Sequence, residues 1–226
     1  MPSPNAPFVS DEPIVEIHRY GLDVQFDQIY LVGSDEYISH EELAEPGVEH
    51  SMASHFIKNL NILMCRNSDP ILIHMKTCGG YWEEGMAIYD AIVACPSKVT
   101  ILNYTHARSM SSIIFQAADK RVMMPHSIFM FHEGDIEFSG TPKKLRSFHA
   151  QEAYALEAML DIYIASMKKK GRMSKARPET IRQWLVEQMD KKEDVFLSAK
   201  EAVEYGFADE IFGAEGKYDW KKLIEY

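Results

Sequence analysis

Short apolar segments alternate with amphipathic segments between residues 26 and 131. The short segments are rich in Ile, Leu, Val and Phe, which is typical of strands, and we expect strands at residues 26–32, 70–76, 98–104 and 127–131. The intervening segments place apolar residues on one helical face, and we expect helices at residues 51–64, 81–95 and 109–119. Strands that alternate with helices in this way are typical of parallel sheets. The pattern therefore predicts an α/β fold.

A long amphipathic helix is expected from about residue 142 to 170. Its apolar stripe has a spacing near 3.5 residues and comprises Leu145, His149, Leu156, Leu160, Tyr163 and Met167. At the helical rise this stripe is about 40 Å long, which is more than one neighbouring element of such a domain covers. We therefore expect another subunit to bury it, since an exposed stripe promotes aggregation.

Two shorter helices are expected near the end of the chain. Residues 177–189 are amphipathic and begin with Pro178, which suits the first turn of a helix. In residues 196–206, Ser198 and Glu201 have the spacing of a capping box, and Gly206 provides the left-handed residue that ends a helix.

Composition and charge limit the partners of this chain. The 226 residues, 46% of them apolar, can form one compact core. The formal net charge of −10 argues against nucleic acid or an anionic membrane surface as the main partner. No apolar run approaches the ~20 residues that span a bilayer. Three cysteines and a first segment without a signal-peptide pattern favour a reducing cytoplasm.

A glycine pair, Gly79 and Gly80, lies between an expected strand and the helix at 81–95. Such a turn lets the backbone approach a ligand closely, and its N–H groups can face an anion. A simple tight turn is the alternative interpretation. A phosphate site is not supported, because no G-x-x-x-x-G-K-[ST] or G-x-G-x-x-G motif follows the strand.

A serine cluster occupies the corresponding place one strand later, after a turn expected at residues 105–108. Ser109 would lie at the carboxyl end of a parallel strand, where α/β folds carry their sites, and could be a nucleophile. Taken alone, the segment favours a helix cap at Ser109 and packing roles for Ser111 and Ser112. His132 directly follows the next strand and would lie at the same end as Ser109, whereas His126 precedes that strand.

Three blocks of this sequence, taken together, resemble a known family. They are CGGYWEEGMAIYDAI, ARSMSSIIFQAADKRVMMPHSIFMFHEG and DVFLSAKEAVEYGFADEI. In this order they are similar to the proteolytic subunit of the Clp protease, a serine peptidase with a crotonase-like fold. The resemblance implies stacked ββα units with a protruding long helix. It implies an N-terminal extension at 1–25, a peptidase domain at 26–212 and a C-terminal tail at 213–226. The polar segment at 35–50 is not typical of the family. The CGGYW turn also replaces a smaller turn of the family, so Tyr81 and Trp82 would narrow the peptide groove that the resemblance implies.

The resemblance also implies roles for individual residues. Ser109 would be the nucleophile, His132 the general base and Asp194 the residue that orients the imidazole. The backbone N–H groups of Gly80 and Met110 would form the oxyanion hole. A serine attacks only when a base removes its proton, and the base needs a carboxylate to hold one tautomer. No metal and no cofactor are expected.

The family resemblance further implies a cytoplasmic homo-oligomer of heptameric rings stacked in pairs. A separate ATP-dependent unfoldase of the AAA+ class would supply unfolded protein substrates to its chamber. Two other functions stay open: a non-catalytic ring subunit or scaffold, and a crotonase-type acyl-CoA enzyme with the same fold. The second does not need a Ser-His-Asp set.

Overall fold

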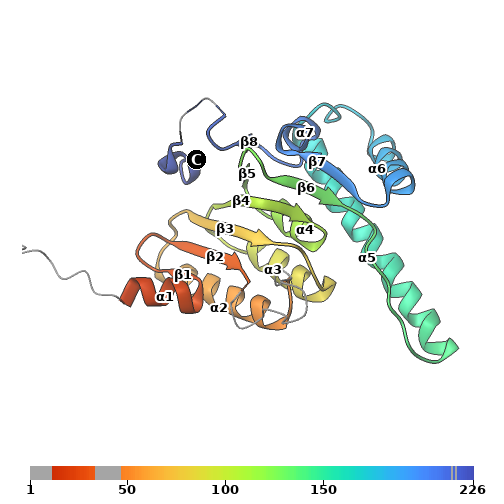
Figure 1. Ribbon diagram of the computed structural model, residues 1–226, viewed down its shortest axis with the longest axis horizontal. Coiled ribbons are helices and arrows are strands. Elements are labelled where there is room, and N and C mark those ends of the chain that lie inside the picture. Colours follow the sequence, from red (N-terminus) through yellow and green to blue (C-terminus); the bar gives the residue numbers. More distant parts are fainter. Residues whose placement is uncertain (1–11, 34–46, 215, 217) are drawn as a thin grey trace, which may run out of the picture.

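The computed structural model describes residues 12–33, 47–214, 216 and 218–226. One mixed sheet organises them (Figure 1). Its strands are β1 (Leu22–Asp23), β2 (Gln28–Val32), β3 (Ile71–Thr77), β4 (Val99–Arg108), β5 (Lys120–Met123), β6 (Ile128–Phe131), β7 (Val195–Ser198) and β8 (Glu210–Ile211). The main path runs β1-β2-β3-β4-β5-β8 and is parallel from β2 onward. The predicted α/β class is confirmed, although β1 and β7 are antiparallel to β2 and β6.

Helices lie around this sheet, with α2, α3 and α4 on one face (Figure 1). The helices are α1 (Glu12–Tyr20), α2 (His50–Arg66), α3 (Trp82–Val93), α4 (Met110–Gln116), α5 (Pro142–Lys169), α6 (Pro178–Lys192), α7 (Ala199–Tyr205) and a 3-10 helix (Trp220–Leu223). The helices expected from the apolar pattern are therefore all present, within a few residues of their predicted ends. The capping box of Ser198 and Glu201 and the left-handed Gly206 are confirmed at the two ends of α7.

The turn predicted at residues 105–108 is wrong, because β4 continues through these residues to Arg108. The first part of β4 pairs with β5, and its last residues, His106 to Arg108, pair with β6. One strand thus has two successive partners on the same side. The four-residue strands β5 and β7 were not predicted at all. The longer β4 carries the chain to the edge at which Ser109 begins the next turn.

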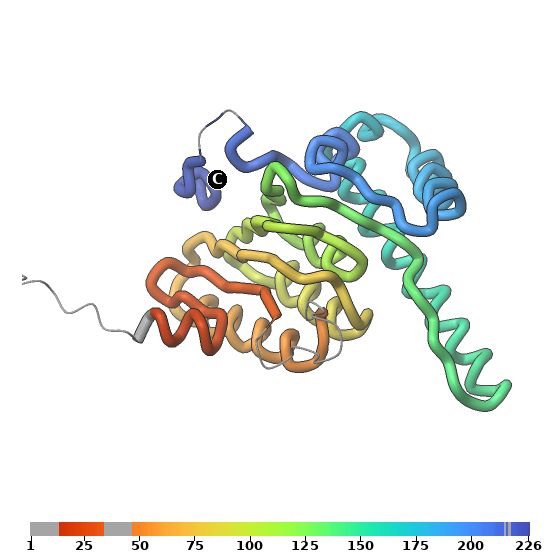
Figure 2. Tube along the Cα trace, viewed as in Figure 1, coloured from red at the N-terminus to blue at the C-terminus, as the bar shows by residue number. Residues whose placement is uncertain are grey.

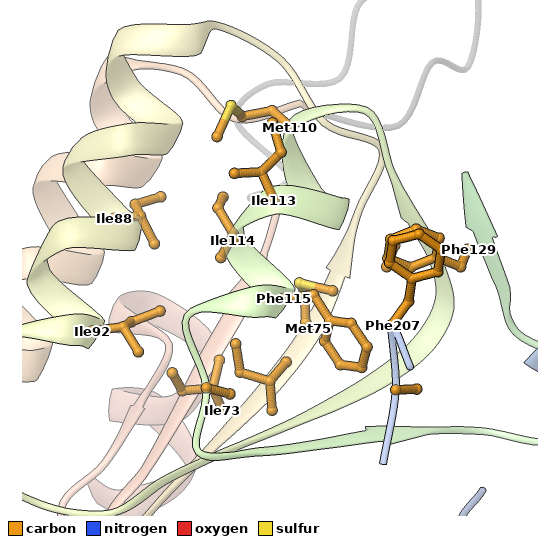
Figure 3. Close-up of a cluster of buried hydrophobic side chains, with 14 of the residues drawn as sticks. Ile73, Met75, Ile88, Ile92, Met110, Ile113, Ile114, Phe115, Phe129 and Phe207 are labelled. Carbon is orange, nitrogen blue, oxygen red and sulfur yellow. The ribbon is translucent and has the colours of Figure 1, made fainter. Parts of the chain in front are cut away.

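The core lies between the sheet and α3, α4 and the inner half of α5. All seven residues of α4 are buried. Figure 3 shows Met110, Ile113 and Ile114 facing Ile88 of α3. Phe129 of β6 stacks on Phe207, with ring centroids 4.5 Å apart. Burial of this kind stabilises a fold by about 25 cal/mol per Å² of apolar surface, so α4 is held rigidly just beyond β4.

Helix α5 projects away from the rest of the molecule, as the long helix was predicted to do (Figure 1). Its buried residues all belong to its inner half, from Ala155 to Met167. Residues 132–141 run beside the outer half (Figure 2), and Phe138 lies 5.0 Å from Phe148 between ring centroids. Leu145 remains 49% exposed. The predicted stripe is therefore covered by its own chain in the inner half and is open to solvent in the outer half.

The opposite face of the sheet carries a second apolar cluster beneath the last residues of the chain. It consists of Leu72, Leu102, Val122, Phe212 and Leu223. The buried Thr100 hydroxyl donates a hydrogen bond of 2.5 Å to the Leu223 carbonyl. The residue boundaries at 25 and 212 stay a prediction. Most of the polar 35–50 segment and residues 1–11 lie outside the described residues.

His74 of β3 lies on this same face among aromatic rings. Its ring stacks on Tyr30 with centroids 4.5 Å apart, and its nitrogens lie 2.9 Å from the Tyr104 hydroxyl and from Gln28 Oε1. The Gln28 oxygen only accepts, so Nε2 donates to it and Nδ1 accepts from Tyr104. Burial lowers the pKa of His74 to about 4. The folded protein thus holds this imidazole neutral.

Stability should fall as pH decreases through the range set by His74. Between the ordinary pKa of 6.5 and the folded value of about 4, the unfolded chain binds the proton and the folded chain does not. The contribution of His74 to the free energy of unfolding is therefore complete above pH 6.5. About 3 kcal/mol of it is lost as the pH falls toward 4. Denaturant unfolding at pH 7.5 and 4.5 measures this loss. His74→Gln should reduce the difference between the two pH values, and the exposed His126→Gln should not; an equal difference in all three proteins contradicts the assignment.

Candidate active site

Ser109 occupies the single residue between β4 and α4. Its backbone has φ 52° and ψ −128°, a positive-φ conformation outside the left-handed helical region that is strained for a residue with a Cβ. Its N–H donates to the Met130 carbonyl at 3.1 Å. Although Ser109 is the N-cap residue of α4, its side chain makes no capping hydrogen bond. The Ser109 hydroxyl instead points to His132, so the capping interpretation is not the one observed.

His132 comes directly after β6, which lies beside the last residues of β4. Its Nε2 is 2.8 Å from Ser109 Oγ. Its Nδ1 is 3.1 Å from Asp194 Oδ1. The carboxylate can only accept, so Nδ1 carries a proton, and in the neutral ring Nε2 then accepts the Ser109 O–H. His126 precedes β6 and lies at the other end of that strand.

Asp194 immediately precedes β7, whose antiparallel pairing with β6 places Val195 opposite Phe131. Asp194, one residue before β7, therefore lies beside His132, one residue after β6. The Asp194 side chain is 47% exposed, compared with 18% for His132. The structure thus brings Ser109, His132 and Asp194 into one hydrogen-bonded series, built from three segments that are distant in sequence.

The glycine pair packs against this serine turn. A Cβ on Gly79 would lie 2.7 Å from both the Arg108 carbonyl oxygen and Ser109 Cβ, and Gly79 has φ +100°. On its other side, the Gly79 carbonyl accepts from the Val48 N–H at 2.6 Å. In a trans peptide the C=O and the next N–H point in opposite directions. The Gly80 N–H therefore points away from Val48.

Two cavities, of about 800 and 660 Å³, meet at Ser109 and His132. Gly80 and Met110 line the larger one together with Tyr81 and Trp82, the aromatic pair expected beside a groove. Besides the aromatic pair, the apolar part of this cavity is formed by Met110, Ile113, Phe148, Ala155, Leu156 and Met159. An apolar group of a ligand fits such a surface.

Carboxylates dominate the charged lining of both cavities. They are Glu83, Glu133, Asp135, Glu137, Glu152, Asp190, Glu193 and Asp194. Among the described lining residues, Arg108 alone carries a permanent positive charge, and its Nε donates to the Cys78 carbonyl at 3.3 Å. A cavity lined mainly by carboxylates has a negative electrostatic potential, and this potential disfavours the binding of acidic ligands.

Ser111 and Ser112 are fully buried, as their predicted packing roles require, and both also form hydrogen bonds. Ser111 Oγ donates to the Thr77 carbonyl, and Ser112 Oγ donates to the Ser109 carbonyl. Sequence reasoning missed the bond of Ser111, because its partner lies on β3, 34 residues away.

The described part of the chain contains no group of three or more His, Cys, Asp or Glu side chains arranged to hold a metal ion. Within the same residues, no helix combines the length and the apolar character needed to cross a membrane.

Comparison with known proteins gives one consistent result. The sequence model of the Clp protease family matches residues 41–215. The ATP-dependent Clp protease proteolytic subunit 2 of Pseudomonas aeruginosa is 29% identical over 171 residues, which cover 75% of this chain and 79% of that protein. The subunit 2 of Prochlorococcus marinus is 32% identical over 150 residues, or 64% and 66% of the two chains. The solved structure of a ClpP1 mutant from Listeria monocytogenes has a TM-score of 0.66 at 20% identity, covering 88% of this chain and 96% of that one.

The close approach of Gly79 to Ser109 should make Gly79→Ala strongly destabilising. The new Cβ would add a clash to the cost of a positive φ, and we expect a loss of about 2–4 kcal/mol in the free energy of unfolding. Gly134→Ala is the matched control, because Gly134 has φ +97° but no atom within 4 Å of the added Cβ. It should cost only the strain of the positive φ, at the lower end of its range, about 1 kcal/mol. Equal losses in denaturant unfolding would show that the contact with Ser109 is unimportant.

Proposed function

This chain belongs to the Clp protease family, and we propose that it is a serine endopeptidase whose nucleophile is Ser109. The observation that carries the proposal is the hydrogen-bonded series from Ser109 through His132 to Asp194, with distances of 2.8 and 3.1 Å. These distances are within the reach that proton transfer and tautomer control require. The family likeness supports the same assignment, since the curated relatives are proteolytic subunits.

In the proposed reaction, Ser109 Oγ attacks the carbonyl carbon of a peptide bond while His132 Nε2 takes the hydroxyl proton. The imidazole becomes positively charged, and the Asp194 carboxylate stabilises it through the Nδ1–H bond. The same proton then passes from Nε2 to the leaving amine, and an acyl ester on Ser109 remains. Water, activated in turn by His132, hydrolyses this ester and restores the serine.

We assign the oxyanion hole to the backbone N–H groups of Gly80 and Met110. The Gly80 N–H points away from Val48. Gly80 and Met110 both line the cavity that contains Ser109. Met110 is the first residue of α4, where a backbone N–H has no partner within the helix and the helix dipole favours negative charge. Each such donor stabilises the transition state by about 3 kcal/mol.

We further propose that the working form is a homo-oligomer of heptameric rings stacked in pairs. The family suggests oligomeric rings and a separate Clp ATPase. The number of subunits and the AAA+ unfoldase that supplies unfolded protein are our proposal. The exposed outer half of α5 and the segment beside it support the assembly. Leu145 of α5 is 49% exposed and Ile136 of the preceding segment is 62% exposed, and exposed apolar side chains of this kind favour burial by another subunit. A chamber closed by rings would admit short peptides and unfolded chains and exclude folded proteins.

Covalent capture with a fluorophosphonate, followed by peptide mapping, tests the proposed chemistry. The label should attach to Ser109, and Ser109→Ala should abolish both labelling and cleavage of a fluorogenic peptide. Asp194→Asn should keep the volume but disturb the tautomer of His132, slowing labelling by about 10³- to 10⁴-fold. Labelling at Ser111 or Ser112 would contradict the assignment. A chain that neither labels nor cleaves would be a non-catalytic subunit, and hydration of a crotonyl thioester would indicate the acyl-CoA enzyme.

Light scattering tests the assembly, for which the chain mass of 25.9 kDa is the reference. Wild-type protein should scatter as a particle many times heavier. Leu145→Glu places a charge on the exposed half of α5 and should break the assembly, whereas the apolar Leu145→Met should preserve it. Leu160 is unsuitable for this test because it is 1% exposed within its own chain. An unchanged mass for Leu145→Glu contradicts the role of α5 in the assembly, and a fully active wild-type monomer contradicts the assembly itself.

A further inference from the structure

We propose that Ser111, Ser112 and Tyr163 are positioning residues. They hold the Ser109 turn and the backbone N–H groups of Gly80 and Met110 in the relative positions that the reaction requires. This inference rests on the proposed peptidase function and adds residues to it that do not touch the substrate. Neither cavity beside Ser109 includes any of the three among its lining residues. Their effect on the reaction would therefore be transmitted through the backbone.

The first contact holds the strained residue itself. The Ser109 carbonyl accepts from the Ser112 N–H at 2.9 Å and from the Ser112 hydroxyl at 2.6 Å. The N–H of Ser109 is bound by Met130 on the other side. Both polar groups of the Ser109 backbone are thus fixed, and a strained conformation persists only where its surroundings determine it in this way.

The Ser112 hydroxyl is itself held by Tyr163 of α5, whose oxygen is 2.6 Å away. Ser112 has one hydroxyl hydrogen, and the Ser109 carbonyl can only accept, so that hydrogen points to Ser109. Tyr163 must therefore be the donor to Ser112. Burial raises the pKa of Tyr163, which keeps the phenol protonated for this role. The result is a series from α5 through Ser112 to the nucleophile's carbonyl.

Ser111 connects the same helix turn to the glycine turn. Its hydroxyl donates to the Thr77 carbonyl at 2.9 Å, and both residues are completely buried. Thr77 ends β3, shortly before Gly80, whereas Ser111 directly follows Met110. The bond therefore links the two segments that supply the proposed oxyanion donors. Because both residues are inaccessible to solvent, the carbonyl loses a buried partner if the hydroxyl is removed.

Steady-state kinetics on a fluorogenic peptide measure this positioning. Ser111→Ala, Ser112→Ala and Tyr163→Phe each remove one hydroxyl with little change in packing. Each should lower kcat by about 10- to 100-fold, because the affected groups act in the transition state, and should leave KM nearly unchanged. Full kcat in Ser111→Ala and Ser112→Ala overturns the proposal.

Ser127→Ala is the matched control for a loss of folding stability. Ser127 is buried and its hydroxyl donates to the Met124 carbonyl at 2.8 Å, three residues away, as Ser112 does to Ser109. It lies before β6, at the end remote from His132. Ser127→Ala should keep wild-type kcat. A fall in its kcat equal to that of Ser112→Ala overturns the proposal, since the loss of any buried serine hydroxyl would then lower kcat.

A double variant tests the order of the series. If Tyr163 acts only through Ser112, adding Tyr163→Phe to Ser112→Ala should lower kcat little further. If the fold losses in kcat of the two single variants instead multiply in the double variant, the two residues act independently and the series is wrong.

A crystal structure of the Ser111→Ala/Ser112→Ala protein separates this inference from the peptidase function. We expect Ser109 to leave its positive φ and the Gly79 turn to move away from Met110. Retention of both features overturns the positioning role, whether or not the wild-type protein is active. An inactive wild-type protein whose double variant shows the expected movement would contradict the peptidase function alone.

Discussion

The pairing of β6 with β4 on one side and β7 on the other is the constraint on which the site depends. Arg108 is opposite Met130, and Phe131 is opposite Val195. Ser109, His132 and Asp194 each lie one residue outside this ladder. Main-chain hydrogen bonds, which are insensitive to the identity of most side chains, therefore determine the spacing of the three groups. A shift of register by one residue would also turn their side chains to the other face of the sheet.

Sequence patterns predicted the features that depend on local order. Ser109 and His132 were candidates because each follows an expected strand, and parallel strands end at one edge. The position of Asp194 followed only from family resemblance, because its contact with His132 arises through β7, a four-residue strand without a clear apolar pattern. The last residues of β4 were mistaken for a turn for a similar reason. His106 to Arg108 are extended because β6 pairs with them, which no local propensity reports.

Other features could not be predicted because their partners are distant in the chain. The buried Arg121 forms hydrogen bonds with Gln116, Gly206 and Asp209, and so joins the end of α4 to the segment after α7. Burial alone would raise the pKa of Asp209, but the hydrogen bonds and the charge of Arg121 outweigh burial and lower it. The stripe of α5 was identified correctly as apolar. Its division into a covered and an exposed half depends on how far the rest of the fold extends along the helix.

The late position of β7 has a consequence for biosynthesis. Domains begin to form during translation from the N-terminal side, and contacts between distant segments form slowly. A nascent chain can therefore pair β4 with β6 and carry the serine and the imidazole while the carboxylate has not yet been synthesised. The proposed nucleophile would be complete only when nearly the whole domain has folded. The order of the strands along the chain would thus delay hydrolytic activity until the segment that carries Asp194 has been synthesised and has paired with β6.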